Sequence, residues 1–294
     1  MPAVFLCVVV FLLYTAQAFA DKQSSRIANT DNQVMLFGVV KCGLSALFAL
    51  IFLLCSFHVG EVNVHTVWIS VLAGIGQGVC TYLLVITLKQ CTMVQVNLFM
   101  SVGVLVPTIM SMILYNEPLS LLRWGAIGLF LIAAALLLGI KKWEDFKMNG
   151  KACGLLLLLS LFFGLIMFAQ KSYPKMVPSG NVSLFSLLMY CTSTLLLSIG
   201  FFATRKKAEN MPKNSKGKKF FLTAVVCAVI VFLLNQSITL LSGQLSAALA
   251  FTLTNGAKLL LVVLVSVLYY KEKLTWRSMT GMLLMFISVF ILSV

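Results

Sequence analysis

Acidic residues are scarce in this chain. Only eight of its 294 residues are Asp or Glu, whereas 22 are Lys or Arg. All eight fall in expected loops or at the ends of apolar segments: Asp21, Asp31, Glu61, Glu117, Glu144, Asp145, Glu209 and Glu272. The middle of each membrane span therefore lacks a carboxylate, which argues against drug exporters that exchange protons through an intramembrane Glu. The same scarcity argues against membrane-embedded hydrolases and prenyltransferases, which need carboxylates, His or metal ligands.

Residue types that ligate metals are also few and scattered. The eight cysteines form no C-x-x-C pair, and His58 and His65 share one loop without a cluster of thiols or carboxylates. Cysteines spread through apolar segments behave as small apolar side chains. We therefore expect no enzymatic activity, no metal site and no cofactor.

Hydrophobic residues dominate what is present, at 61% of the chain against 10% charged residues. This composition is typical of an integral membrane protein. A helix needs roughly 20 apolar residues to cross the bilayer, and the long continuous runs lack the alternation of a β-barrel. The sequence predicts an all-α membrane protein with ten transmembrane helices, at residues 3–20, 34–56, 66–88, 93–114, 120–140, 152–170, 183–203, 220–241, 246–270 and 276–293.

Two junctions in the chain resemble each other. LYNEPLSLLRWG (114–125) and LYYKEKLTWRSMTG (268–281) share the pattern E-x-L-[ST], and each leads into a final apolar helix. At the starts of the two halves FADK (19–22) aligns with FAQK (168–171). Because each half then contains an odd number of spans, the second half is expected to be inverted relative to the first.

The N-terminal segment MPAVFLCVVVFLLYTAQAFADKQ has two interpretations. Ala16, Ala18 and Ala20 form the small-residue pattern of a signal-peptide cleavage site. However, no Lys or Arg precedes the apolar run, and its FADK ending recurs as FAQK at the end of the sixth span. We therefore predict that the segment is retained as the first transmembrane helix.

The two five-helix halves, each closing with Glu, a Leu-[Ser/Thr] turn and a small-residue helix, resemble the EamA-like members of the drug/metabolite transporter superfamily. VLVPTIMSMILYNEPLS (104–120) is similar to the family's Pro-containing fourth helix. Gly281 stands where the closing-helix glycine is expected, although the first half has Ala126 there. The resemblance implies two EamA-like repeats, residues 1–145 and 146–294. The family includes exporters of amino acids and other metabolites, and nucleotide-sugar and sugar-phosphate carriers are its relatives.

The basic residues indicate how the chain sits in the membrane. Alternate loops carry 17 Lys and Arg on one side against three on the other, Arg123, Lys171 and Lys175. The positive-inside rule then places both termini outside, whereas the family resemblance implies termini inside. We follow the charge count. The densest basic run, RKKAENMPKNSKGKK (205–219), is a topology signal on this interpretation, so no nucleic-acid partner is expected.

Two lysines fall inside predicted spans. Lys258 lies about halfway along the ninth span, where a charge costs at least ~2.5–3.5 kcal/mol. Asn255 and Thr254 share its helix face. Lys258 either binds carbonyls and hydroxyls of neighbouring helices or lines a cavity and meets a negative or carbonyl group of a substrate. Lys41, nearer a helix end, is explained by snorkelling as well as by function.

Other polar residues recur at helical spacing in the third, fourth and eighth spans. Such residues serve as interhelical hydrogen bonds or as cavity lining. The glycines of LAGIGQG (72–78) favour close helix packing over a phosphate-binding loop. The predicted cavity-lining residues are Lys258, Asn255, Thr254, Asn235, Gln77, Thr81, Asn97 and Ser101.

These features predict a secondary transporter, an exporter or exchanger of small polar metabolites that works by alternating access. One alternative is a carrier of nucleotide sugars or phosphorylated metabolites, which Lys258 suits. A second alternative is a membrane scaffold or receptor without transport. The expected partners are a small-molecule substrate and the lipid bilayer of the plasma (inner) membrane, and a homodimer stays open as an oligomeric state.

Overall fold

The computed structural model describes residues 3–27, 30–56, 60, 62–91, 93–116, 120–137, 150–204, 215–256 and 276–293. Within these ranges the chain is helical apart from short connections and an isolated bridge between Gly60 and Gly180. Residues 247–256 are also helical. The other helices are α1 (Ala3–Ile27), α2 (Asp31–Cys55), α3 (Val64–Gln90), α4 (Met93–Val102), α5 (Leu105–Tyr115), α6 (Leu121–Leu137), α7 (Gly150–Met176), α8 (Val182–Thr204), α9 (Ser215–Gln244) and α11 (Trp276–Ser293).

The all-helical class expected from the sequence is confirmed. Five helices, α2, α3, α7, α8 and α9, are long and apolar enough to cross a membrane. Shorter apolar stretches lie in α1, α4 to α5, α6 and α11. Many large apolar side chains are exposed, as a helix surface in contact with lipid requires. The protein is an integral, multi-pass membrane protein, while the number of ten spans and their repeat stay predictions.

The fourth predicted span is not one helix. It is interrupted at Gly103 and Val104, between α4 and α5. Pro107 has no N–H to donate to the Gly103 carbonyl, which accepts from the Val106 N–H at 3.2 Å instead. α7 crosses closely at this point, since a side chain on Gly164 would lie 2.6 Å from the Gly103 oxygen. Proline and tight packing together account for the interruption.

The N-terminal segment forms α1, which runs seven residues beyond its predicted end to Ile27. α1 packs along α9. Val10 and Tyr14 are buried in one apolar cluster with Leu234, Ile238 and Phe251. This segment is therefore part of the wall of the bundle, although its retention in the mature chain stays a prediction.

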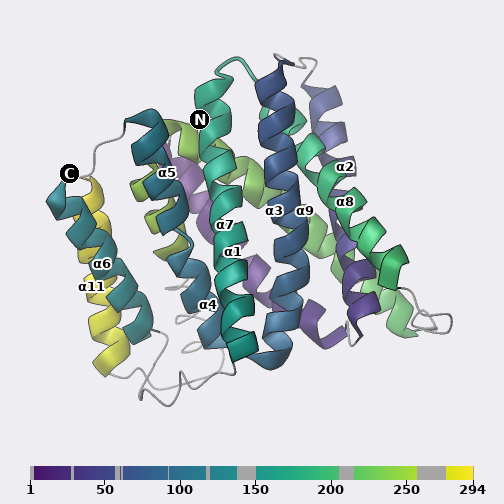
Figure 1. The fold of residues 1–294 in the computed structure, drawn as a ribbon, viewed down its shortest axis with the longest axis horizontal. Coiled ribbons are helices and arrows are strands. Elements are labelled where there is room, and N and C mark those ends of the chain that lie inside the picture. Colours follow the sequence, from purple (N-terminus) through teal and green to yellow (C-terminus); the bar gives the residue numbers. More distant parts are fainter. Residues whose placement is uncertain are drawn as a thin grey trace.

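The helices form a bundle in which the two halves of the chain interleave (Figure 1). α6 and α11 lie side by side at one edge, and α2 and α8 lie together at the opposite edge. Between these pairs α3 packs on α7 and α8, while α9 packs on α1 and α2. The most extensive contacts thus join helices of the first half to helices of the second.

The glycine-rich stretch of α3 allows this interleaving. A side chain on Gly74 would lie 2.5 Å from Cβ of Thr192 on α8, and one on Gly76 would lie 3.0 Å from Ile166 on α7. The Gly74 carbonyl accepts a hydrogen bond from the Ser193 hydroxyl at 2.8 Å. The packing interpretation of LAGIGQG is confirmed, because these glycines let α3 approach both neighbours closely.

Lys171, which the sequence analysis counted among the basic residues of the loops, lies inside a helix. Lys171 is within α7 and only 2% exposed. Its Nζ donates to the Ser242 carbonyl at 3.0 Å and to the Leu245 carbonyl, at the C-terminal end of α9. The prediction that Lys171 is a loop cation is therefore wrong. A cation here satisfies carbonyls that a helix end leaves unpaired and interacts favourably with the helix dipole.

Candidate substrate cavity

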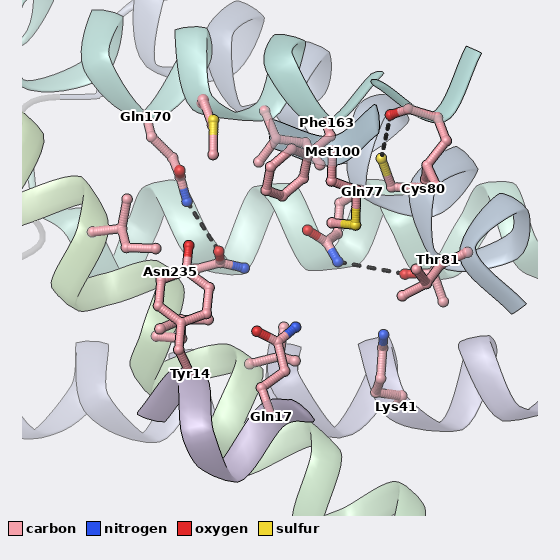
Figure 2. A pocket seen from close by; sticks show the side chains of 17 residues that line it. Tyr14, Gln17, Lys41, Gln77, Cys80, Thr81, Met100, Phe163, Gln170 and Asn235 are labelled. Carbon is pink, nitrogen blue, oxygen red and sulfur yellow. Dashed lines mark hydrogen bonds between the residues drawn. The ribbon is translucent and has the colours of Figure 1, made fainter. Parts of the chain in front are cut away.

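A small cavity lies among α1, α2, α3, α4, α7 and α9 (Figure 2). Its volume is about 70 Å³. Because one water needs about 10–15 Å³ of such space, the cavity has room for about five water molecules. The polar side chains that line it come from five helices and are Tyr14, Gln17, Lys41, Gln77, Cys80, Thr81, Gln170 and Asn235.

On one side of the cavity an amide joins three helices. The Gln170 side chain on α7 donates to Oδ1 of Asn235 on α9 at 3.0 Å. Nδ2 of Asn235 donates to the Tyr190 hydroxyl on α8 at 2.8 Å, and that hydroxyl donates to the Val231 carbonyl at 3.1 Å. These polar groups are therefore satisfied by the protein itself.

The opposite side carries a cation. Lys41 is 7% exposed, and Figure 2 shows its amine pointing toward Thr81 of α3. Gln77 donates to the Thr81 hydroxyl at 3.4 Å, and Gln17 contributes a buried Oε1 without a hydrogen-bond partner among the described residues. This side therefore presents both a charged donor and a free acceptor to whatever fills the cavity.

Three of the predicted cavity-lining residues, Gln77, Thr81 and Asn235, lie together around this space. Ser101 is buried on α4, next in sequence to the lining residue Met100. Asn97 is also on α4, with its side chain outside the described residues. α3, α4 and α9 thus contribute to the cavity wall.

The predicted residues of the ninth span lie differently. Thr254 is buried beside a second, mostly apolar cavity of about 570 Å³ between α1, residues 247–256 and α11. Its hydroxyl is hydrogen-bonded with that of Tyr14, which lines the central cavity. Asn255 is buried, and its side chain donates to the Phe251 carbonyl at 2.8 Å. Lys258 lies outside the described residues.

Sequence reasoning did not select five of the polar lining residues: Tyr14, Gln17, Lys41, Cys80 and Gln170. Gln17 and Gln170 each interrupt an apolar run near a helix end. Neither was paired with a second polar residue on the same helix face, which was the pattern used to select cavity-lining residues. The position of Lys41 in the sequence does not distinguish a lysine that snorkels to water from one that faces a cavity. Cys80 and Tyr14 read as ordinary apolar side chains.

Comparison with known proteins identifies the second half of the chain. Residues 150–294 match the EamA-like transporter family. The chain belongs to this family through its second half. EamA-like proteins of the drug/metabolite transporter superfamily are membrane transporters, so the family agrees with the resemblance noted in the sequence.

The fold of this EamA-like protein also matches solved structures. A crystal structure of a protein is similar over 98% of this chain and 95% of its own, with a TM-score of 0.73 and 13% identity. At this identity the match shows a shared fold, which extends over the first half as well as the second. In all, 28 chains of solved structures match, and no curated protein does.

Proposed function

We propose that this EamA-like protein is a secondary carrier, an exporter or exchanger of small polar metabolites that works by alternating access. The observation that carries the proposal is the cavity among six apolar helices, five of which supply it with hydrogen-bonding side chains. Transporters place the substrate between repeats in this way, near the bilayer midplane.

The spacing of the lining residues supports two repeats around this cavity. Four residues of α3 and four of α9 line it with the same spacing: Gln77, Cys80, Thr81 and Leu84 against Val231, Leu234, Asn235 and Ile238. Two lining residues of α1 also match two of α7 when FADK is aligned with FAQK: Tyr14 then takes the position of Phe163, and Gln17 that of Ile166. Equivalent helices of the two halves thus contribute equivalent positions.

The helix contacts support the same proposal. α3 packs on α7 and α8, and its counterpart α9 packs on α1 and α2. α2 contacts its counterpart α8, and α6 contacts its counterpart α11. Exchanging the two halves leaves this pattern unchanged, as expected for two five-helix repeats, residues 1–145 and 146–294, related by a pseudo-two-fold axis.

The size of the cavity favours a small substrate. At about 70 Å³ it is well below the roughly 300–1,000 Å³ of pockets that enclose drug-sized ligands. A nucleotide sugar would require a much larger opening, so the small-metabolite function is favoured over that alternative. We retain Lys258, Asn255, Thr254, Asn97 and Ser101 as proposed contributors to the substrate path, since Tyr14 joins residues 247–256 to the cavity.

A thermal-shift screen of purified protein against metabolite libraries, followed by counterflow in proteoliposomes, tests this function. Thr81→Val removes a hydroxyl that lines the cavity, and Thr87→Val is its matched control, a buried threonine of the same helix outside the cavity. We expect Thr81→Val to weaken ligand stabilisation and to raise KM for counterflow, and Thr87→Val to change neither.

The outcomes separate the rival functions. Ligand stabilisation without counterflow would favour a receptor or scaffold. If no metabolite stabilises the protein and no counterflow occurs, the carrier function is contradicted.

A further inference from the structure

Lys41 is the one charged residue among the described side chains that line the cavity. It stands ten residues into α2, and its amine points inward toward α3 (Figure 2). A snorkelling lysine instead extends along the helix surface to the membrane boundary. The geometry therefore excludes snorkelling as the explanation of Lys41.

The surroundings of Lys41 do not supply a counter-ion among the described residues. Thr81 and Gln77, the polar groups toward which the amine points, are neutral and are hydrogen-bonded to each other. Asp31, at the start of the same helix, pairs with Lys89 at 3.7 Å. A buried cation needs water, hydrogen-bond acceptors or an opposite charge to compensate it. Lys171 has two carbonyl acceptors, whereas Lys41 makes no such bond to the described residues, so the cavity must provide the compensation.

The second half of the chain has, at the position equivalent to Lys41, a polar group whose hydrogen bonds are all made within the protein. When Cys42 is aligned with Cys191, Tyr190 takes the position of Lys41. The Tyr190 hydroxyl is satisfied by Asn235 and by the Val231 carbonyl. At the equivalent position in the first half the chain has a longer cation that points at the open space instead.

We propose that Lys41 is the specificity-determining residue of the carrier: its ammonium group binds an anionic group of the transported solute, a carboxylate being the simplest. This inference rests on the proposed transport function and narrows its substrate class to anions and zwitterions. The free Oε1 of Gln17 on the same side accepts a hydrogen bond from an N–H or O–H group of that solute. Cationic solutes are rejected because Lys41 repels them.

Cys80 offers a reporter of the charge preference, since its thiol lines the cavity and Cys55 is exposed at the end of α2. The folded protein is treated with an anionic (sulfonate) or a cationic (trimethylammonium) methanethiosulfonate reagent. Peptide mass spectrometry then gives the modification rate at each cysteine. The measured quantity is the anion-to-cation rate ratio at Cys80 divided by that ratio at Cys55, which removes the intrinsic reactivity of the reagents.

We expect this normalised ratio to be at least about tenfold in the wild type, because Lys41 places a unit charge beside the same small cavity that Cys80 lines, at intermediate dielectric. Lys41→Gln should bring it close to one. Lys41→Arg should preserve it, as should the control Lys151→Gln, which removes an exposed lysine at the start of α7.

A wild-type ratio near one, or a ratio that survives Lys41→Gln, overturns the role of Lys41 and leaves the transport function standing if counterflow is observed. If Lys41→Gln does not fold, the wild-type and Lys41→Arg ratios decide the question. If Cys80 reacts with neither reagent in the folded protein but reacts fully after unfolding, the cavity does not admit a charged solute of that size beside Lys41. That result overturns the role of Lys41, while counterflow alone decides the transport function.

Discussion

Asn235 connects three helices through one side chain. It accepts from Gln170 of α7 and donates to Tyr190 of α8, and all three side chains are buried. A leucine of similar size cannot make either bond, so Gln170 and Tyr190 would each lose the hydrogen bond that they make with Asn235 inside the bundle. Removing a buried partner carries a larger penalty than the mean worth of a hydrogen bond suggests.

Asn235→Leu is therefore expected to lower the free energy of unfolding by about 1–3 kcal/mol. Thermal unfolding of the detergent-purified protein measures the change. Gln236→Leu is the matched control, because its bond to Ser183 is only partly buried and the freed hydroxyl can be hydrated. Equal losses in the two variants would contradict the structural role of Asn235.

Lys171 makes a second residue-scale prediction. Lys171→Met leaves the Ser242 and Leu245 carbonyls without their charged donor, and we expect a loss of about 1–3 kcal/mol in the free energy of unfolding. Lys175→Met, four residues later, removes only an exposed ammonium over the Tyr115 ring, worth about 0.5–1 kcal/mol. Thermal melts of both variants should show the larger shift at Lys171. A larger shift at Lys175 would mean that Lys171 is not a helix cap.

At the scale of the helix, the packing of α3 depends on glycine. Gly74→Ala places Cβ against Cβ of Thr192 and the Met189 carbonyl, so α3 and α8 must separate. Overpacking of this kind costs about 1–3 kcal/mol. Gly128→Ala in α6 meets nothing within 4 Å and should be neutral or stabilising by up to about 1 kcal/mol. Melting temperatures that fall equally in both variants would refute the close-packing role.

Helix positions were predictable from the sequence wherever the length of an apolar run sets the length of the helix. The second, third, sixth and seventh predicted spans all correspond to single long helices. The fourth span could not be predicted as two helices from its length, because α4 and α5 together are as long as one span. Pro107 was visible in the sequence, but only the crossing of α7 at Gly103 shows where the interruption falls.

The candidate site was predictable where two polar residues share a helix face, as Gln77 and Thr81 do. Single polar residues such as Gln17 gave no comparable signal, because one polar residue in an apolar helix serves equally well as an interhelical bond. What the Lys41 face of α2 meets depends on the long-range packing of α2 against α8 and α9. That information lies in the tertiary contacts and not in local spacing.

For the whole molecule, the charge bias predicts that both termini face away from the cytoplasm. A reporter that is active only in the cytoplasm, fused after Val294, is therefore expected to be inactive, and the same reporter inserted within the basic loop at 205–214 should be active. The reverse pattern would show that the orientation implied by the EamA-like family holds instead.

The meeting of Gly60 with Gly180 joins the two halves at one end of the bundle. The Asn181 side chain reinforces it by donating to the Ser56 hydroxyl at 3.1 Å. Each such bond contributes only about 0.5–1.5 kcal/mol, so the carrier proposed above could break and re-form this contact between its halves at little cost in free energy.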